Sequence, residues 1–464
     1  MAAFAVVATL WATAAFAAPP SPGVCQPLAS LSFKFPPTTV AGLKAYVIYN
    51  NLSEPRGMRF DAKQNLLVVE RYIGVNALTF RNDSTCVGWE KRVVIANTNL
   101  EHGIEIGPGP GNNQYLYASS MENVFRWVYN PATASVVGSP TTLTWNMTNV
   151  GAIPPDHVTR TLLLEPPVAG VSKFLIVSRG SAGNVDDAAG NQCEYWYGSD
   201  PPLPAYRCSG QYWMGVAARP GPQLGEPKRS WDGLSRDEQN VWDIENSSDE
   251  VHWRGVDVHQ DNPAEELNLI PLQAAASIPI DRRFYGYPSC FTAWDKSTVP
   301  KNASAPQFNF NTGEQFSIRT PPTMPDDTWC QDPKKNVPPK LSLQAHTAPL
   351  DLIFYQNSKC SLGSSKQALP KAWDGDAFVS LHGSWNRDHP TGYGVARIPW
   401  SKQQDRPIAN SNAKDGYVTI VKAPDMSKCP EECIRPVGLV IDQLGRMIVS
   451  SDESGELFML EKFN

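Results

Sequence analysis

Apolar and polar residues alternate with a period of two in short runs along most of this chain, and turn-forming residues separate the runs. One clear unit, PRGMRFDAKQNLLVVERYIGV, occupies residues 55–75, and a second, RPVGLVIDQLGRMIVSSDESGEL, occupies residues 435–457. Both contain a glycine, a short alternating strand, a turn that begins with aspartate, a second apolar strand and a polar loop. Each unit therefore predicts at least two β-strands joined by a turn.

The same pattern recurs less strictly in four other segments, at residues 101–127, 156–184, 241–270 and, split by an insertion, 345–387. One such unit cannot bury both faces of its sheet, so we expect neighbouring units to pack against one another. Six units of roughly 45 residues each, plus insertions, match the blades of a radial array. The pattern predicts an all-β fold, a six-bladed β-propeller of four-stranded blades. The alternative is a β-sandwich with accidental internal similarity.

The fourth of these units departs from the pattern. Residues 214–246 are rich in proline, glycine and charged residues, and they show no apolar alternation before Val241. We therefore expect blade 4 to be irregular, and a missing inner strand would expose the edges of its neighbours. Either an unusual strand fills this position or a segment is missing from the sequence.

The first 18 residues are apolar and end in a small-residue pattern around Ala17. They predict a secretory signal peptide, residues 1–18, followed by one propeller domain, residues 19–464. An apolar N-terminal strand is the alternative. No other apolar run approaches the roughly 20 residues needed to span a bilayer, so we expect a secreted, extracellular protein without a membrane partner.

Cysteines and glycosylation sequons agree with secretion. The chain has nine cysteines, which in an oxidising compartment predicts disulfides and one spare thiol. Cys429 with Cys433 and Cys193 with Cys208 are plausible pairs, and the remaining connectivity stays open. Five sequons stand at Asn51, Asn82, Asn146, Asn246 and Asn302.

Charge and missing motifs exclude several classes of function. The formal net charge is −6, whereas binding to nucleic acid or to an anionic membrane calls for a basic surface. The chain has no G-x-S-x-G turn of the serine hydrolases and no G-x-G-x-x-G after a strand, as in dinucleotide-binding dehydrogenases. No CxxC pair recurs with zinc-finger spacing, which argues against a zinc site.

Histidines and arginines concentrate where a propeller would bring them together. In such a fold, the residues before each innermost strand and those after the second strand surround one mouth of the central channel. Four of the seven histidines occupy these positions: His102, His157, His346 and His382. Arginine binds carboxylates in a bidentate manner, and a neutral histidine suits general-base catalysis. The pattern predicts one shared site for an anionic, planar ligand.

Several segments together resemble a known family. They are PRGMRF, LEHGIEI, DHVTRTL, NPAEELNLI with YGYPSCF, AHTAPLDLIFY, SLHGSWNR and RPVGL. With them the chain resembles the soluble aldose and pyranose dehydrogenases that depend on pyrroloquinoline quinone (PQQ), especially their fungal secreted, L-sorbosone dehydrogenase-like branch. The resemblance covers nearly all of the mature chain. It implies a six-bladed propeller that holds PQQ over a calcium ion and oxidises a sugar, either a pyranose, a 2-keto-aldose or a sorbosone-like compound.

The resemblance also implies roles for individual residues. His157 matches the general base that takes the hydroxyl proton while a hydride passes to the quinone, and His102 matches a polar position beside that chemistry. Ser247 and Ser248 match the segment whose backbone carbonyls hold calcium, an ion that prefers oxygen ligands. We expect the sequon at Asn246 to remain unused, because a glycan cannot sit inside a cofactor pocket. The positions that match the cofactor's surroundings are Arg56, His346, His382, Trp385, Arg387 and Arg435.

Partners and alternative functions stay open at this point. The resemblance suggests an external electron acceptor, either a cytochrome or a copper monooxygenase, and we expect a separate protein because the chain has no room for an appended cytochrome domain. A calcium-dependent lactonase-type hydrolase on the same scaffold would line the channel with several acidic side chains. A non-catalytic binding propeller is the third possibility, if the irregular fourth blade abolishes PQQ binding.

Overall fold

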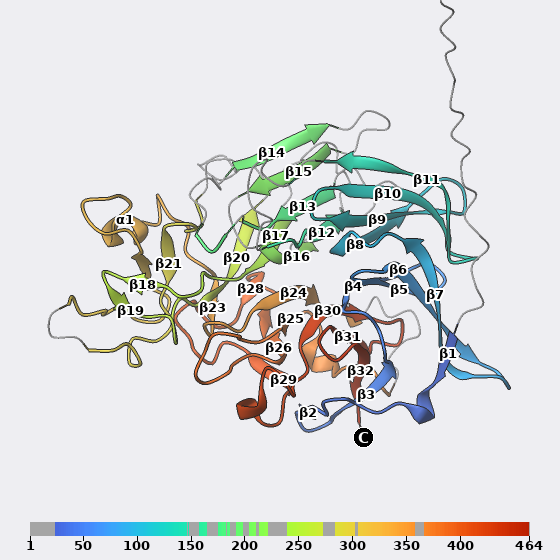
Figure 1. The fold of residues 1–464 in the computed structure, drawn as a ribbon. Helices are drawn as coiled ribbons and strands as arrows, with labels where there is room; N and C mark the ends of the chain where they lie inside the picture. Colours follow the sequence, from blue (N-terminus) through green and yellow to red (C-terminus); the bar gives the residue numbers. More distant parts are fainter. Residues whose placement is uncertain are drawn as a thin grey trace, which may run out of the picture.

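β-Sheets stand side by side around a common centre in the computed structural model of the protein (Figure 1). The structure describes residues 24–145, 147, 157–164, 175–181, 183–185, 192–197, 204–209, 213–220, 239–271, 284–301, 305–357 and 366–463. The helical elements with described bounds are α1 (Asp327–Cys330), η1 (Leu28–Ser30), η4 (Lys371–Trp373) and η5 (Met426–Lys428). None of the described helices is long and apolar enough to cross a membrane.

Six sheets within the described ranges have four or five strands, and we number them along the chain. The first sheet has the order β1 (Val24–Pro27), β7 (Val87–Ala96), β6 (Gly74–Asn82), β5 (Leu66–Glu70) and β4 (Pro55–Phe60). The second has the order β11 (Ser135–Thr144), β10 (Val124–Asn130), β9 (Gln114–Ser120) and β8 (Leu100–Pro108). The third has the order β12 (Leu162–Leu164), β13 (Leu175–Arg179), β15 (Pro204–Ser209) and β14 (Gln192–Tyr197).

The other three large sheets come from the second half of the chain. The fourth has the order β16 (Trp213–Pro220), β17 (Gln239–Glu245), β20 (Glu265–Pro271) and β23 (Leu341–Leu343). The fifth has the order β2 (Thr38–Thr39), β29 (Val418–Lys422), β26 (Gly394–Ile398), β25 (Ala377–Leu381) and β24 (Pro349–Phe354). The sixth has the order β3 (Leu43–Tyr49), β32 (Glu456–Lys462), β31 (Met447–Ser451) and β30 (Pro436–Ile441).

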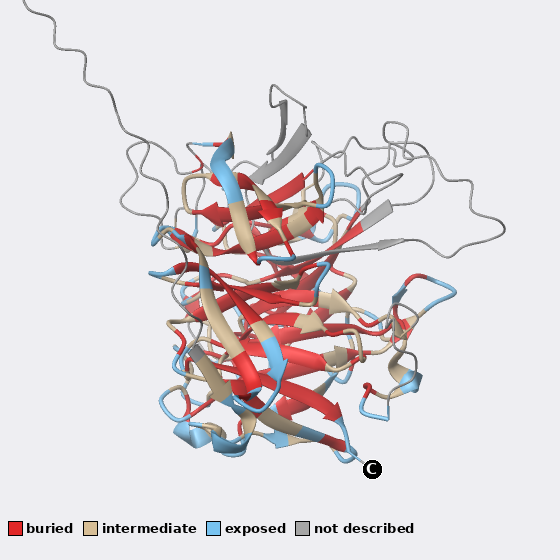
Figure 2. Ribbon diagram, turned by 90° about the vertical axis from the view of Figure 1, so that its right-hand side faces the viewer, coloured by how far each residue is buried: buried red, intermediate tan, exposed pale blue. Residues whose placement is uncertain are grey.

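The innermost strands of these sheets form a ring. Each of β4, β8, β12, β16, β24 and β30 contacts the next, and β30 contacts β4. The second strands β5, β25 and β31 are buried along their whole length, because each lies between two neighbouring sheets. Buried residues accordingly concentrate in the strands, and exposed ones at the sheet edges and turns (Figure 2). The predicted all-β propeller is confirmed.

The prediction of six four-stranded blades with blade 4 irregular is wrong, because only five of the described sheets form regular antiparallel blades. Five of the six numbered sheets are antiparallel throughout their described pairings, and two of them have five strands. The irregular sheet is the third, in which β13 pairs with β15 in parallel. In the fourth sheet, β16 pairs with β17 in the ordinary antiparallel way, so the segment without apolar alternation still supplies an innermost strand.

Serine side chains tie neighbouring sheets together. The Ser450 hydroxyl accepts a hydrogen bond from the Gly438 N–H (2.8 Å) in its own sheet and donates one to the Arg56 carbonyl (2.8 Å) in the first sheet. Ser119 and Ser380 make the same pair of bonds from the second and fifth sheets. Gly438 permits this approach, since a Cβ there would lie 2.5 Å from the Arg56 carbonyl oxygen. These contacts hold the inner strands in register across sheets.

The N-terminal segment contributes to three sheets. Strand β1 pairs with β7 in the first sheet, β2 pairs with β29 in the fifth, and β3 pairs with β32 in the sixth. The sixth sheet therefore combines a strand from near the start of the chain with the last three strands. This pairing closes the ring.

An outer lobe, made of described residues 251–263, 284–301 and 305–340, projects from the fourth sheet. It contains α1 and two short hairpins, which appear away from the large sheets in Figure 1. One hairpin joins β18 (His252–Trp253) to β19 (Val256–Asp257), and the other joins β21 (Cys290–Thr292) to β22 (Gln315–Ser317). The side chains of Trp253, Phe308 and Phe316 pack together in its core. A further hairpin in the fifth sheet's connections joins β27 (Trp400–Ser401) to β28 (Arg406–Pro407).

Disulfides connect several of these parts. The predicted pair Cys429–Cys433 is confirmed, and Cys25–Cys86 and Cys290–Cys330 are also bonded. The backbone register places Cys193 opposite Cys208 on β14 and β15, as the predicted second pair requires. The signal peptide, Cys360, Asn146 and Asn302 lie outside the described residues.

Candidate active site

A cavity of about 270 Å³ opens where the loops at one end of the sheets converge. It gathers residues from positions as far apart in the sequence as Arg56 and Arg435, as the propeller geometry predicts. Seven of the ten predicted site residues line it: Arg56, His157, Ser247, His346, His382, Trp385 and Arg435. The other lining residues are Val158, Thr159, Asn246, Asp249, Glu265, Ala348, Leu350, Gly383, Ser384 and Asn386.

His157 lies just before β12 and its ring is held by Ser181. The Nδ1 atom is 3.2 Å from the Ser181 carbonyl oxygen and 3.3 Å from its hydroxyl, and this hydroxyl donates its own proton to the Gly183 carbonyl. Because a carbonyl only accepts, Nδ1 carries the proton. With its proton on Nδ1, the neutral ring of His157 has its lone pair on Nε2, which is the form that a general base requires.

His382 has the opposite tautomer. Its Nε2 lies 2.9 Å and 3.0 Å from the two carboxylate oxygens of Asp452, and its Nδ1 lies 2.9 Å from Nη2 of Arg435. Nε2 must donate and Nδ1 must accept, because guanidinium has no acceptor. Burial lowers the pKa of His382, and although Asp452 acts in the opposite direction, the net shift is downward. His382 is neutral, and both of its nitrogens are committed to the protein.

Asp452 also binds Arg56, whose Nη1 lies 2.5 Å from the second carboxylate oxygen. Burial alone would raise the pKa of Asp452, but the hydrogen bond from His382 and the charges of Arg56 and Arg435 hold it well below its usual value. The carboxylate is thus ionised and neutralises part of the positive charge of the cavity wall. Asp452 does not line the cavity itself.

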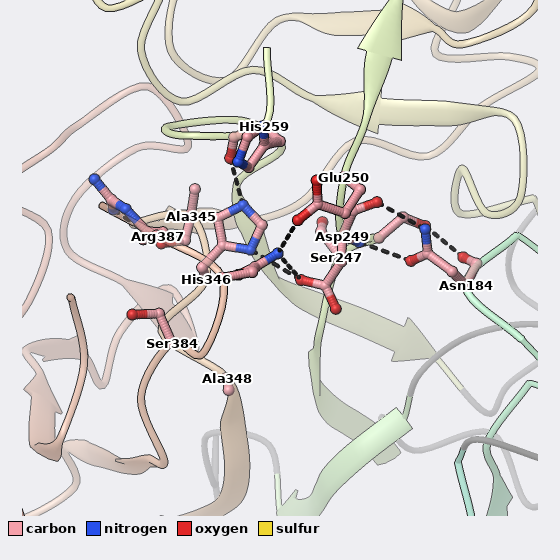
Figure 3. Close-up of polar contacts among 12 residues, drawn as sticks. Asn184, Ser247, Asp249, Glu250, His259, Ala345, His346, Ala348, Ser384 and Arg387 are labelled. Carbon is pink, nitrogen blue, oxygen red and sulfur yellow. Dashed lines mark hydrogen bonds and ion pairs between the residues drawn. The ribbon is translucent and has the colours of Figure 1, made fainter. Parts of the chain in front are cut away.

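His346 is the third histidine and is doubly hydrogen-bonded to acceptors (Figure 3). Its Nδ1 lies 3.1 Å from Oδ1 of Asp249, and its Nε2 lies 2.5 Å from the carbonyl oxygen of His259 in the outer lobe. Burial lowers the pKa of His346, but Asp249 and Glu265 together raise it by more than burial lowers it, so the net shift is upward. Both nitrogens donate, so the ring is an imidazolium.

Glu265 supports the cavity floor from the start of β20. The residue is 3 % exposed, and its carboxyl group accepts hydrogen bonds from the backbone N–H groups of Ser247 (2.7 Å) and Ala348 (3.0 Å). Burial raises the pKa of Glu265 to about 7. This group joins the loop after β17 to the turn before β24.

Asn184 clamps the same loop from the other side (Figure 3). Its amide oxygen accepts from the Asp249 N–H and its amide nitrogen donates to the Asp249 carbonyl, both at 2.7 Å. The Ser248 hydroxyl donates to the Asn184 backbone carbonyl (2.8 Å). The loop after β13, which also holds the His157 ring through Ser181, is therefore fixed to the loop after β17 that carries Ser247.

Three predicted site residues lie outside the cavity wall. His102 is 4 % exposed on β8, and burial together with the charges of Arg56 and Arg59 lowers its pKa to about 3. Arg387 bonds to Asp261 of the outer lobe (2.7 Å). Ser248 is fully buried, with its hydroxyl held by Asn184. Roles of these residues at the cofactor stay predictions.

Asp249, Glu265 and Asn386 are site residues to which sequence reasoning assigned no role, whereas Asn246 was expected in the pocket as an unused sequon. Asn386 donates to Asp249 (3.0 Å), so the loop after β25 is tied to the loop after β17. Asn386 belongs to the HGSWNR motif, and Asp249 belongs to the segment that matches the calcium loop. Both motifs therefore identified the correct loop, although neither residue was singled out. Nothing in the sequence indicated the hydrogen bond from His346 to the outer lobe.

The cavity fits an anionic, polar ligand. Arg56, Arg435 and protonated His346 supply positive charge, and three buried polar atoms at the wall have no hydrogen-bond partner: Arg56 Nε, Asn246 Oδ1 and Asn386 Oδ1. A glycan on Asn246 would fill this space, which agrees with an unused sequon. The backbone carbonyls of Ser247 and Ser248 accept no hydrogen bond from the described residues, so they fit an oxygen-coordinated cation.

Comparison with known proteins shows which family has a similar sequence. A model of the family described as TrAA12-like matches residues 37–463. The curated "Pyrroloquinoline quinone-dependent sugar dehydrogenase" of Hypocrea jecorina is 32% identical over 438 residues, which cover 92% of this chain and 89% of that protein. The "Pyrroloquinoline quinone-dependent pyranose dehydrogenase" of Coprinopsis cinerea is 30% identical over 96% of this chain, which spans 56% of that longer protein.

Solved structures agree with these sequence matches. The Trichoderma reesei carbohydrate-active enzyme of family AA12, in its iodide structure, has a TM-score of 0.74 and 30% identity, with 94% of this chain and 99% of that chain covered. The holo form of the pyranose dehydrogenase PQQ domain from Coprinopsis cinerea has a TM-score of 0.70 and 27% identity, with 92% and 97% covered.

Proposed function

The chain belongs to the TrAA12-like family, and we propose that it is an oxidoreductase that removes a hydride from a sugar hydroxyl with PQQ as its cofactor. The names of its relatives from Hypocrea jecorina and Coprinopsis cinerea support the reaction class. One observation in the structure carries the proposal: His157, in the tautomer of a base, shares a cavity with Arg56 and Arg435. Such a reaction needs a base for the hydroxyl proton and a positively charged wall that binds the carboxylates of the cofactor.

Five residues are suited to hold the cofactor. Arg56 and Arg435 provide guanidinium groups for carboxylates, and protonated His346 adds a third positive charge. His382 has no nitrogen left for a ligand, so it contributes a ring face, as does the exposed ring of Trp385. PQQ, when bound, supplies the two-electron acceptor.

His157 performs the proton transfer in this proposal. Nε2 accepts the substrate's hydroxyl proton, while the Ser181 carbonyl keeps the proton on Nδ1 and stabilises the resulting imidazolium. General-base catalysis of this kind typically contributes about 10²–10⁴-fold in rate. The positive charges of Arg56 and Arg435 would stabilise the negative charge that the cofactor gains when it is reduced.

Calcium is the proposed metal. The backbone carbonyls of Ser247 and Ser248 are the proposed ligands, and Glu265 and Asn184 position the loop that bears them. The Ser247 hydroxyl bonds to the Ala264 carbonyl, so the backbone of Ser247, rather than its side chain, is the ligand we propose.

The third sheet serves as the sixth blade in this proposal. Its innermost strand β12 contacts β8 on one side and β16 on the other, the positions that a blade would have in the ring. Its parallel β13–β15 pair changes the order of the outer strands only.

Secretion and an external electron acceptor complete the proposal. The apolar leader and the disulfides support an extracellular location. The acceptor would be a cytochrome or a copper monooxygenase. Among the described residues no group of three His, Cys, Asp or Glu side chains is placed to hold a metal, which disfavours the lactonase alternative.

The decisive experiment is a titration of the purified protein with PQQ and calcium, followed by dye reduction with L-fucose and glucosone. We expect micromolar binding of PQQ and sugar-dependent reduction. Absence of binding at micromolar PQQ would contradict the proposal and favour a non-catalytic binding propeller. Binding without turnover of any sugar would contradict the enzymatic part alone.

A further inference from the structure

A second cavity, of about 700 Å³, lies between the outer lobe and the fifth sheet's connections. It shares no residue with the cavity at the channel mouth. One wall consists of residues 311–314, Pro339 and Lys340, and the other of Arg406 and residues 409–412. The comparisons and the proposed function leave this cavity without a role.

The outer-lobe wall is held in place by backbone contacts and meets the facing wall at one point. In the outer lobe, the Gly313 N–H bonds to the Ala293 carbonyl (2.9 Å), and the Lys340 N–H bonds to the Leu267 carbonyl (2.8 Å). Gly313 has a φ of +85°, and a Cβ there would lie 3.1 Å from the backbone of Asn412, so the two walls meet at this point. The cavity is therefore a preformed feature of the docked lobe.

The charges of the cavity are unbalanced at one place. Lys340 and Arg406 both line it, burial lowers the pKa of Lys340, and the positive charge of Arg406 lowers it further. The only hydrogen bond that the described residues offer the Arg406 guanidinium is from Nε to Gln404. The lining thus has two positive side chains, Lys340 and Arg406, and one carboxylate, Glu314, and the excess of positive charge attracts an anion.

The acidic group of the cavity is already occupied. Glu314 accepts hydrogen bonds from the backbone N–H (2.7 Å) and side-chain amide (3.1 Å) of Asn311. Thr312 donates to the Trp294 carbonyl (2.7 Å). On the facing wall, the side chains of Asn410, Ser411 and Asn412 make no hydrogen bond with the described residues, so amide and hydroxyl groups remain for a ligand.

We propose that this cavity binds a carboxylated saccharide, with Lys340 and Arg406 pairing with the carboxylate and the Asn410–Asn412 side chains bonding to hydroxyls. The lining contains no aromatic side chain for stacking, so the carboxylate would provide the main attraction. Such a carboxylate belongs either to a uronate residue of a polysaccharide or to a free sugar acid. The proposal does not depend on PQQ or on turnover.

Calorimetric titration at low ionic strength tests the site, with trigalacturonate, gluconate and neutral cellotriose as probes. We expect trigalacturonate to bind with a millimolar Kd and the double variant Lys340→Gln, Arg406→Gln to weaken it at least about tenfold, as loss of charge-assisted hydrogen bonds would. The control Lys366→Gln, Lys371→Gln removes two exposed charges elsewhere and should leave the Kd unchanged.

Each alternative outcome has a definite meaning. Binding of gluconate with the same dependence on Lys340 and Arg406 would support the site and identify a free sugar acid as its ligand. Cellotriose binding as tightly as trigalacturonate would overturn the proposal, as would no binding of either acid. Equal losses in the control variant would overturn it too, because they would show a general field effect.

Discussion

Nε2 of His382 lies 2.9 Å from Oδ1 of Asp452, and this contact determines which nitrogen of the ring carries the proton. Since Arg435 only donates to the other nitrogen, His382 is a neutral link between an anion and a cation. The three histidines of the cavity thus have three different protonation patterns: His157 protonated on Nδ1, His382 on Nε2, and His346 on both.

Replacing His382 tests this link. His382→Phe removes one donor from Asp452 and one acceptor from Arg435 in a buried charged network, so we expect a loss of about 2–4 kcal/mol in the free energy of unfolding. His382→Gln keeps one donor and one acceptor and should lose clearly less. Urea unfolding at pH 7 measures both values, and equal losses would contradict the assigned hydrogen bonds.

Asp452 makes the stability sensitive to acid. Its pKa is lower in the folded protein than in the unfolded chain, where it is about 3.9. Its contribution is therefore complete above about pH 4 and is lost as the pH falls through the folded value. We expect the unfolding free-energy difference between the wild type and Asp452→Asn to be constant from pH 6 to 8 and to shrink below about pH 4. A difference that persists unchanged to pH 3 would refute this.

His346 makes the stability sensitive to alkali. Its folded pKa lies above the unfolded value of about 6.5, so its contribution is complete below that pH and is lost as the pH rises through the folded value. We expect the stability difference between the wild type and His346→Gln to decrease above about pH 6.5. His252 is exposed, and His252→Gln is the control that should show no such trend. A pH-independent difference for His346 would mean that the ring is neutral.

Turnover tests the base. His157→Ala should reduce sugar-dependent dye reduction at least about 100-fold, because the proton acceptor is gone, while PQQ affinity changes little. His389 is exposed on the loop after β25, and His389→Ala should leave turnover unchanged. Steady-state rates and a PQQ titration separate the two effects. An unchanged rate in His157→Ala would exclude this residue as the base.

The serine contacts between sheets link stability to the cofactor wall. Ser450→Ala leaves the Gly438 N–H and the Arg56 carbonyl unsatisfied, so we expect a loss of about 2–4 kcal/mol and weaker PQQ binding. Ser119→Ala breaks the same contact between the second and third sheets and should lose similar stability without weakening PQQ binding. Equal effects on PQQ affinity would show that the contact does not position Arg56.

Period-two alternation was sufficient to predict an all-β propeller and to bring His157, His346 and His382 to one mouth. It failed for β16, because that strand lacks apolar alternation and is specified by its neighbours instead. The parallel β13–β15 pair likewise depends on contacts between distant residues. The protonation state of His346 was beyond sequence reasoning, since the deciding acceptor is a carbonyl of the outer lobe.

His102 shows a different limit. Family resemblance placed it beside the chemistry, and the charge of Arg56 does lower its pKa, but its side chain is buried and does not line the cavity; a register shift between Leu100 and Ile104 surrounds it. Between Leu100 and Ile104 the strand β8 has two more residues than β9 has opposite them, and such a shift has no compositional signature.

The pairing of β3 with β32 has a consequence for biosynthesis. The innermost strand of the sixth sheet, β30, is synthesised after the innermost strands of the other five sheets, and Arg435 directly precedes it. Until then β4 and β24 have an open gap between them, with sheet edges free to pair with other chains. A product of premature termination before β30 would therefore lack both a closed ring and a cofactor wall, and we expect it to be removed by quality control rather than to persist as a partly active protein.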